Sequence, residues 1–454
     1  YKPLKAPDHA RLSRLQRELQ GLLCLCLDER SMVGTVTFGW LEFLLRVGMY
    51  SGCCADESYG GLKILLLFGD DGQLPPVFES RLFQLRREAS EAGKNGAFHY
   101  RAIRDCIFLT DVVRQRDDQE CYSCSERWHA PGEKCSKLRD FLLKLRYQKS
   151  PGLAERYGRI TEEDVEWLRE RQVLQLPKPE AAKFASSKAL FIHPRRLTVS
   201  NYNRKELLKL SAGCIPVVKC LAKDTGPCCR GTMDSNGESE YGQMPRLTYL
   251  CRGAPVMLTN NLCPQWGLFN GSMGSVVDIF YANGRKPSRN GKELPDCVFM
   301  HLDGYTGPEV IPGHPKIVPI GPNVFQGHCA HACHRTQLPI RMCWAITVHK
   351  SQGMTVGPNN AVEYLLVDLG EKKTEQWAPG AAFVQLSRVS DIGSLALDSA
   401  VDEDRFLPRV GPTRNGVPEE DRRLYTMHLR TLDQNPGCTD PSQFEELKQY
   451  LFNL

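Results

Sequence analysis

Two adjacent carboxylates, Asp28 and Glu29, directly follow the apolar run LLCLCL at residues 22–27. A continuous apolar run of this length favours a strand buried on both faces of a parallel sheet. Ligands of open α/β sheets bind at the carboxyl ends of the strands, so Asp28 could hold a Mg²⁺ ion there while Glu29 polarises a water for attack on a phosphate. An acidic pair that ends a strand in solvent explains the same residues.

A second apolar run, at residues 62–68, leads into a loop with the sequence GDDGQLPPV. Gly69 permits a sharp turn at the end of the predicted strand, and the two prolines stiffen the exit from the loop. Gln73 offers an uncharged amide that can sense a terminal phosphate. The alternative is an ordinary proline-rich turn after a strand.

A third segment, LPIRMCWAITVHKSQGMT at residues 338–355, predicts a strand over 340–348 followed by a polar cluster. Lys350 can neutralise a backbone phosphate, and the polar groups around it can hydrogen-bond phosphate oxygens without reading base sequence. The candidate nucleic-acid contacts are Thr347, His349, Lys350, Ser351 and Gln352.

The segment APGAAFVQLSRVS, residues 378–390, predicts a helix that projects Arg388. A fixed guanidinium can stabilise the charge that develops on a transferring phosphoryl group. A single arginine on a helix is also an ordinary surface charge, so this interpretation depends on the other three segments.

Four residues with the spacing Cys121-x2-Cys124-x4-His129-x5-Cys135 have the ligand types of a tetrahedral zinc site. The last interval is one residue longer than in the usual zinc-knuckle spacing. The alternative is a cysteine-containing surface loop without metal.

The composition of the 454 residues, with 41% hydrophobic and 24% charged side chains, indicates a soluble globular chain of several domains. No apolar run approaches the roughly 18–20 residues of a membrane-spanning helix, and no signal peptide is recognisable. The net charge of +5 permits nucleic-acid binding without arguing for it. Nineteen cysteines fall below the density of a disulfide scaffold, so we expect thiols in a reducing, intracellular compartment.

The distribution of apolar runs and breakers indicates an α/β fold. Residues 1–110 alternate helical stretches with short apolar runs, and a second α/β region includes the run 189–192 and resumes at 339–397. Residues 211–338 are rich in Gly, Pro and Asn between short β-prone runs, which predicts an inserted β module. A final helix is expected at 442–451.

These segments together resemble superfamily-one DNA helicases of the Pif-like and RecD-like kind. DERSM at 28–32 is similar to the family's Walker B motif, and GDDGQLPPV is similar to its third motif. TVHKSQGMT and FVQLSRV resemble its fifth and sixth motifs. The weaker match VVRQRDDQE resembles the fourth motif and implies a second phosphate-contacting arginine at Arg114, while residues 252–277 resemble the family's SH3-like module.

The resemblance implies two RecA-like parallel-sheet domains, the first one incomplete, with an inserted small SH3-like β module. The corresponding boundaries are 1–112 for the remainder of the first RecA-like domain, 113–210 for the first part of the second with a Cys-rich insertion at 117–137, 211–338 for the insert, 339–400 for the completion of the second domain, and 401–454 for a carboxy-terminal tail.

The resemblance also implies an ATP-dependent DNA helicase that uses Mg²⁺ and moves 5′ to 3′ on single-stranded DNA and at duplex junctions. Its processes would be DNA repair, recombination or telomere maintenance, in the nucleus if the source is eukaryotic. The implied catalytic residues are Asp28, Glu29, Gln73, Arg114 and Arg388.

One departure from the family is that G-x-x-x-x-G-K-[ST], the phosphate-binding loop, occurs nowhere in the chain. The Gly-Lys pairs at 93–94 and 291–292 are followed by Asn95 and Glu293. We therefore expect an amino-terminally truncated chain that has little or no ATPase activity alone. Two alternatives stay open, a RecD-like subunit of a recombination complex and an ATPase-dead remnant that binds nucleic acid.

Overall fold

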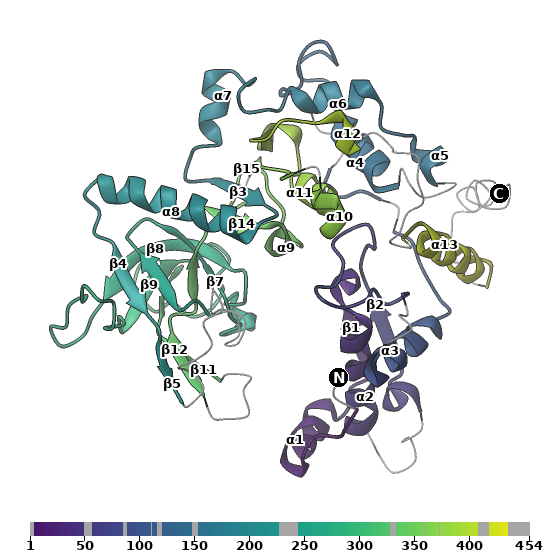
Figure 1. Ribbon diagram of the computed structural model, residues 1–454, viewed down its shortest axis with the longest axis horizontal. Coiled ribbons are helices and arrows are strands. Elements are labelled where there is room, and N and C mark those ends of the chain that lie inside the picture. The colour runs from purple at the N-terminus through teal and green to yellow at the C-terminus, as the bar shows by residue number, and fades with distance from the viewer. Residues whose placement is uncertain are drawn as a thin grey trace. The chain divides into compact units, whose positions relative to one another are not determined.

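The computed structural model describes residues 4–49, 57–84, 89–109, 111–115, 120–147, 153–226, 244–326, 333–358, 360–371, 373–406 and 417–434. Contacts divide the chain into two compact units, whose elements are labelled in Figure 1. The first contains Tyr1–Glu170, Glu371–Ser387 and Ala400–Leu454, and the second contains Arg171–Gly370 and Arg388–Ser399. The helix expected at 442–451 and the start of the Cys-rich insertion, 117–119, lie outside the described residues.

The sheet of the first unit, within the described ranges, is a parallel pair formed by β1 (Cys24–Leu27) and β2 (Ile64–Leu67). Leu27, Leu65 and Leu67 on one face pack against a buried aromatic cluster. The other face is exposed, so the expected burial on both faces is not met for these two strands.

Three helices accompany this sheet: α1 (His9–Leu19), α2 (Thr35–Gly48) and α3 (Glu91–Arg101), together with the 3₁₀ turns η1 (Arg30–Met32) and η2 (Ser58–Gly61). The axes of α2 and α3 approach closely because glycines lie at the crossing. A Cβ atom on Gly39 would lie 1.9 Å from the Ala92 carbonyl oxygen, and one on Gly96 would lie 2.0 Å from that of Thr35.

The remaining helices of the first unit are α4 (Lys137–Tyr147), α5 (Leu153–Tyr157), α6 (Glu162–Arg169), α10 (Thr374–Trp377), α11 (Ala381–Leu386), α12 (Glu403–Phe406) and α13 (Val417–Gln434). Helix α6 begins with a capping box between Thr161 and Asp164, and the acidic residues of its first turn favour the positive end of the helix dipole. Phe141 of α4 contacts both Trp167 and Phe406, which joins three of these helices.

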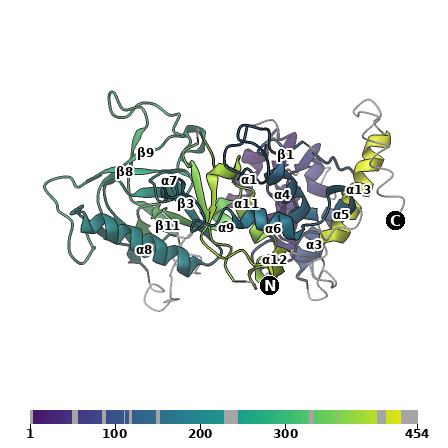
Figure 2. The ribbon, with the colours of Figure 1, turned by 90° about the horizontal axis from the view of Figure 1, so that it is seen from above.

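The second unit has a parallel sheet in the order β14 (Ala345–Thr347), β3 (Ala189–His193), β15 (Tyr364–Val367) and β16 (Leu395–Leu397). Its other elements here are α7 (Lys178–Lys183), α8 (Arg196–Ala212), α9 (Val348–Ser351) and η5 (Ile392–Ser394). Helix α8 packs on β3 and β14 (Figure 2). The strands are largely buried, as expected for a parallel sheet.

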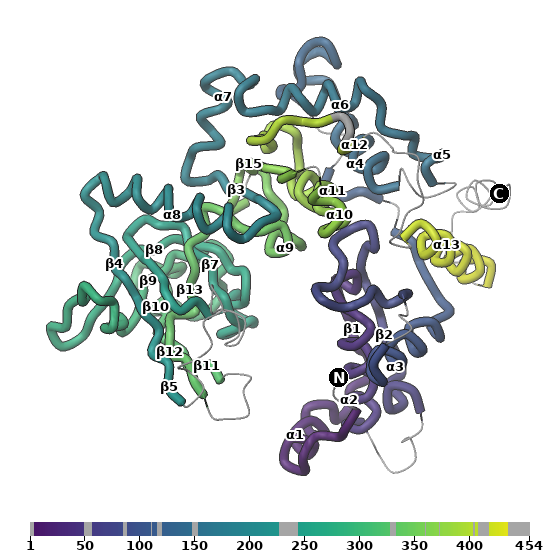
Figure 3. Tube along the Cα trace, viewed as in Figure 1, coloured from purple at the N-terminus to yellow at the C-terminus, as the bar shows by residue number. Residues whose placement is uncertain are grey.

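The predicted β module is present between these segments of the second unit, and its path can be followed in Figure 3. An antiparallel sheet has the order β10 (Ile317–Ile320), β9 (Cys297–His301), β8 (Met273–Phe280), β7 (Pro255–Leu258) and β13 (Ile340–Met342). Smaller sheets pair β4 (Val218–Leu221) with β6 (Leu247–Leu250), and β12 (His334–Gln337) with both β5 (Lys223–Thr225) and β11 (Asn323–Gln326), while η4 (Pro264–Trp266) is a single turn.

The strand predicted over 340–348 is wrong as a single element, because β13 and β14 belong to different sheets. The Cys343 amide donates to the Pro255 carbonyl in the β module, and the Phe191 amide of β3 donates to the Trp344 carbonyl. The chain therefore leaves one sheet and enters the other within two residues.

The predicted fold class, mixed α/β with parallel sheets and an inserted β module, is confirmed. The domain boundaries stay a prediction, although residues 113–170 group with the first compact unit. Among the described residues, no helix combines the length and the apolar character that a membrane span requires.

Candidate nucleotide and nucleic-acid sites

The carboxyl ends of β1 and β2 lie at one edge of the first unit's sheet. The two strands are parallel and in register, with Leu27 opposite Leu67. The Phe68 amide donates to the Leu27 carbonyl at 2.8 Å, and the Arg30 amide donates to the Phe68 carbonyl at 2.8 Å. The segment containing Asp28 and Glu29 is thereby held beside the start of the GDDGQLPPV loop.

Glu29 has a left-handed backbone, with φ 52° and ψ 43°. Its backbone amide donates a hydrogen bond to Oδ1 of the preceding residue, Asp28, at 2.8 Å. A residue with a Cβ atom in this region costs on the order of 1 kcal/mol or more, and such conformations concentrate at functional sites. The turn therefore ends β1 abruptly and places two carboxylates at the sheet edge.

Arg30, the next residue, forms a buried network that sequence reasoning missed. Its guanidinium pairs with Asp71 at 2.6 and 3.3 Å and donates to the Tyr100 hydroxyl at 2.8 Å. Arg81 donates to the Asp71 carbonyl at 2.8 Å, and the Tyr100 hydroxyl donates to Glu420 at 2.8 Å. Burial raises the pKa of Asp71, whereas the Arg30 charge opposes that shift. This network ties the DERSM segment to the following loop.

Asp70 is held by a second buried arginine, Arg146 at the end of α4. Its Oδ1 accepts from Arg146 Nε at 2.6 Å and from the Gly72 amide at 2.9 Å. The other guanidinium nitrogens bind Asp421 of α13, each at 3.0 Å. The loop conformation is thus stabilised by a residue more than 70 positions away, a contact that no local sequence pattern predicts.

Gln73 has an unsatisfied polar atom. Within the described part of the chain, its Oε1 is buried and has no hydrogen-bond partner. The backbone beside it contacts Gly380, whose φ is +85° and whose added Cβ atom would lie 3.0 Å from the Gln73 carbonyl oxygen. A buried amide oxygen without a partner is costly, and a phosphate-bound water or hydroxyl would satisfy it.

Arg114 lies in the same unit and near Glu29. Its guanidinium donates to the Ser387 carbonyl at 3.1 Å, and Gln115 donates to the same oxygen at 3.0 Å. Burial lowers the pKa of Arg114, and the Glu29 charge opposes that effect. The structure thus gathers four of the predicted catalytic residues, Asp28, Glu29, Gln73 and Arg114, in one unit with residues 380–387.

Arg388, the fifth predicted catalytic residue, follows Ser387 directly but belongs to the second compact unit. Its side chain is buried, and its carbonyl accepts from the Val356 amide at 2.8 Å. Its predicted role as an arginine finger stays a prediction.

The predicted nucleic-acid contacts lie at the carboxyl end of β14 and in α9. Thr347 ends the strand opposite His193 of β3. His349 and Lys350 are half-buried, and burial together with the Arg196 charge lowers the pKa of His349. Ser351 is buried, and its hydroxyl donates to the Val348 carbonyl at 2.8 Å, which favours a structural role for this side chain. Gln352 is the residue at which the helix ends.

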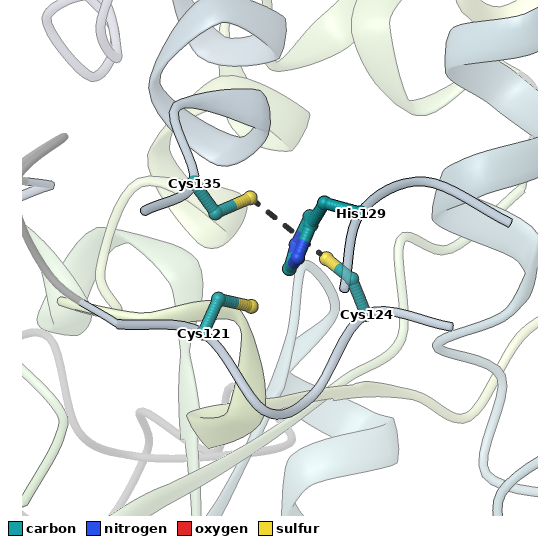
Figure 4. Close-up of side chains that lie close together, drawn as sticks. All are labelled: Cys121, Cys124, His129 and Cys135. Atoms are coloured by element: carbon teal, nitrogen blue, oxygen red, sulfur yellow. Dashed lines mark hydrogen bonds between the residues drawn. The ribbon is translucent and has the colours of Figure 1, made fainter. Parts of the chain in front are cut away.

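The four candidate zinc ligands are brought together in the first unit (Figure 4). One ligand atom from each of Cys121, Cys124, His129 and Cys135 lies within 4.8 Å of all the others. This clustering is what the spacing predicted.

Comparisons with known proteins find relatives of the chain by sequence and by fold. No family model matches the chain. The chain is 28% identical over 375 residues to the zebrafish ATP-dependent DNA helicase PIF1, covering 82% of the chain and 45% of that protein. It is 28% identical over 425 residues to human PIF1, covering 93% of the chain and 53% of that protein. The chain thus spans about half the length of the curated relatives it matches.

A comparison with solved structures finds Pif1 helicases of similar fold. A crystal structure of Bacteroides Pif1 in complex with ADP-AlF3 and ssDNA superposes with a TM-score of 0.60, covering 94% of this chain and 79% of that chain at 16% identity. In sequence along most of its length, and in fold, the chain is therefore similar to the Pif1-like DNA helicases.

Proposed function

We propose that the protein containing this chain is an ATP-dependent DNA helicase of the Pif1-like group. The observation that carries the proposal is the in-register pairing of β1 with β2. This pairing sets the Asp28-Glu29 turn beside the loop that contains Gln73, and Arg114 lies near Glu29. Carboxylates, an amide and a guanidinium at the carboxyl edge of a parallel sheet are the groups that phosphoryl transfer to water requires.

The residue roles follow from this arrangement. Glu29 would accept the proton of the attacking water, and Arg114 would neutralise phosphate charge. Gln73 would orient the water through its unsatisfied Oε1, which accepts, or the terminal phosphate through its amide N–H group, which donates. Arg388 would be a second arginine on the phosphate. These groups position and polarise, which is most of what phosphoryl transfer requires of a protein.

A divalent cation fits the same edge. Asp28 is an exposed carboxylate directly after β1, a donor that Mg²⁺ prefers, and it would hold the ion. When bound, Mg²⁺ would neutralise charge on the phosphates of ATP.

Single-stranded DNA, including strands at duplex junctions, is the proposed polymer substrate. The contacts would come from Thr347, His349, Lys350 and Gln352, with Ser351 shaping the turn. The proposal is supported by the half-buried position of Lys350 after a parallel strand and by the relative crystallised with ssDNA. The same proposal includes movement from 5′ to 3′ and a role in DNA repair, recombination or telomere maintenance. It also includes an intracellular site of action, nuclear in eukaryotes, and the limits of the RecA-like domains given above.

The phosphate cradle would come from residues outside this chain, because residues 1–454 contain no G-x-x-x-x-G-K-[ST] sequence. We propose that a polypeptide of these residues alone does not turn over ATP. DNA-stimulated hydrolysis by that polypeptide would show that some other segment binds the β- and γ-phosphates.

The experiment that tests the function uses the whole protein that contains this chain. Glu29→Gln is expected to leave ATP binding intact and to lower DNA-stimulated turnover by about 10²- to 10⁴-fold, the usual contribution of a general base. Glu57→Gln, at an exposed glutamate of the same unit, is the matched control and should hydrolyse ATP at the wild-type rate. Near-normal turnover by Glu29→Gln would remove Glu29 from the mechanism, and a wild-type protein that binds DNA without any hydrolysis would favour the ATPase-dead alternative.

A further inference from the structure

The loop between residues 120 and 135 is folded around its cysteine and histidine side chains. A β-bridge pairs Glu120 with Lys134, and the Cys121 amide donates to the Glu133 carbonyl at 3.0 Å. The Gly132 amide donates back to the Cys121 carbonyl, also at 3.0 Å, and Gly132 has φ +83°. These contacts bring the two ends of the loop, and with them Cys121 and Cys135, side by side.

The distances between the ligand atoms suit one tetrahedral ion. The Sγ atoms of Cys124 and Cys135 are 3.9 Å apart. Two thiolates bound tetrahedrally at the usual zinc-sulfur distance of roughly 2.3 Å would be about 3.8 Å apart. Cys121 and His129 supply the other two atoms of the 4.8 Å cluster (Figure 4).

The imidazole of His129 is set in the tautomer that binds a metal. Its Nδ1 lies 2.9 Å from the Ala130 carbonyl oxygen, and a carbonyl can only accept, so Nδ1 carries the proton. Nε2 then carries a lone pair that can bind a metal. Among the described residues, this atom is buried and has no hydrogen-bond partner. A backbone carbonyl that fixes one ring nitrogen while the other faces a cation is the usual surrounding of a metal-bound histidine.

Outer contacts hold the loop against α6. Trp167 Nε1 donates to Cys124 Sγ at 3.4 Å, the kind of N–H···S bond that stabilises a bound thiolate. Ser125 donates to Glu170 at 3.2 Å, and Arg127 pairs with Glu166 at 2.7 Å. Three contacts, of which the bond from Trp167 is partly buried, therefore hold the loop on the side of α6.

We propose that Cys121, Cys124, His129 and Cys135 bind one structural Zn²⁺ ion that fastens the start of α4 to α6. Four protein ligands complete a tetrahedron and leave no position for a water, which distinguishes a structural from a catalytic zinc. Cys135 lies two residues before α4, and Arg146 at the far end of that helix holds Asp70. The ion would thus support, through α4, the loop that carries Gln73, without touching it.

Metal analysis of the full chain tests this inference directly and needs no ATPase activity. Protein purified without a metal-binding tag should contain about one equivalent of zinc, and X-ray absorption at the zinc edge should report three sulfur ligands and one nitrogen. His129→Cys should keep the metal with four sulfurs, whereas His129→Ala and Cys124→Ser should lose most of it. Cys214→Ser, at an exposed cysteine outside the cluster, should keep the full equivalent.

A second variant separates metal binding from simple folding. Trp167→Phe keeps an aromatic ring against Phe141 but removes the N–H donor to Cys124, so zinc affinity should fall about 10-fold while the protein stays folded. Zinc far below one equivalent in folded, reduced protein would overturn the inference. So would iron in place of zinc, a disulfide between Cys124 and Cys135, or an equivalent of zinc that survives both His129→Ala and Cys124→Ser.

Discussion

Replacing Arg146 with methionine removes a buried guanidinium that binds two acidic side chains, Asp70 and Asp421. The Arg146 side chain is 6% exposed, and its nitrogens lie 2.6 Å from Asp70 and 3.0 Å from Asp421, whose side chain is 2% exposed. Methionine fills a similar volume but removes the guanidinium that forms two hydrogen bonds with the buried Asp421 carboxylate. Breaking a buried ion pair from one side costs about 3–5 kcal/mol, and we expect a loss of that size in the free energy of unfolding.

The same helix supplies the matched control. Arg139 of α4 pairs with its neighbour Asp140 at 3.2 Å, but the two side chains are 28% and 45% exposed. Arg139→Met should therefore cost less than about 1 kcal/mol, the range of exposed ion pairs. Asp421→Asn combined with Arg146→Met should recover part of the loss, because Asp421→Asn removes the buried negative charge that has lost Arg146.

Urea unfolding followed by tryptophan fluorescence measures these differences, with Trp167 as a reporter beside α4. If Arg146→Met unfolds at the same urea concentration as Arg139→Met, the buried network does not hold the loop. If the double variant is no more stable than Arg146→Met, the loss of stability does not arise from the Asp421 carboxylate that has lost Arg146.

Three further predictions concern other parts of the chain. Gly380→Ala should lower the free energy of unfolding by more than about 1–2 kcal/mol, because the new Cβ atom adds left-handed backbone strain and lies 2.3 Å from the Gly72 carbonyl oxygen. Gly253→Ala is the control, because it adds the backbone strain alone. Equal losses of stability for the two variants in thermal unfolding would show that the clash does not contribute. Burial lowers the pKa of His99 and of His428, so protonation favours the unfolded state. The contribution of the two neutral histidines to stability is complete above about pH 6.5 and is lost as the pH falls below that value. Replacing both with glutamine should therefore make the melting temperature less dependent on pH between about pH 7.5 and 5.5. Lys350→Ala should reduce the salt dependence of single-stranded DNA binding by a slope of about 0.7, and an unchanged slope in fluorescence anisotropy titrations would place Lys350 off the DNA path.

The position of Asp28 and Glu29 after a parallel strand of the first unit could be predicted from the sequence, for a physical reason. An apolar run followed by Asp28 and Glu29 can end only at a strand's carboxyl edge, and parallel pairing then brings the next run's loop beside it. The four zinc-ligand candidates lie within 15 residues of one another, so their spacing already limits how far apart the ligand atoms can be.

Other features depend on contacts that no local pattern encodes. Arg146 reaches Asp70 and Asp421 only because α4 and α13 pack on the same loop. The single strand expected at 340–348 failed because periodicity does not reveal when a chain changes sheets at Cys343 and Trp344. Ser351 has the residue type of a phosphate contact, but its hydroxyl is used within its own turn.

The uncovered face of β1 and β2 has a practical consequence for handling the polypeptide. Ile64 and Leu66 are 49% and 42% exposed on that face, and Leu23 beside it is 67% exposed. Within the described residues, β1 and β2 form a two-stranded sheet, in which each strand has one edge without a partner strand. A short apolar sheet with such edges is a template for pairing with other molecules and for aggregation. A polypeptide of these 454 residues should self-associate increasingly with concentration and ionic strength, and Ile64→Lys together with Leu66→Thr should keep it monodisperse in light scattering.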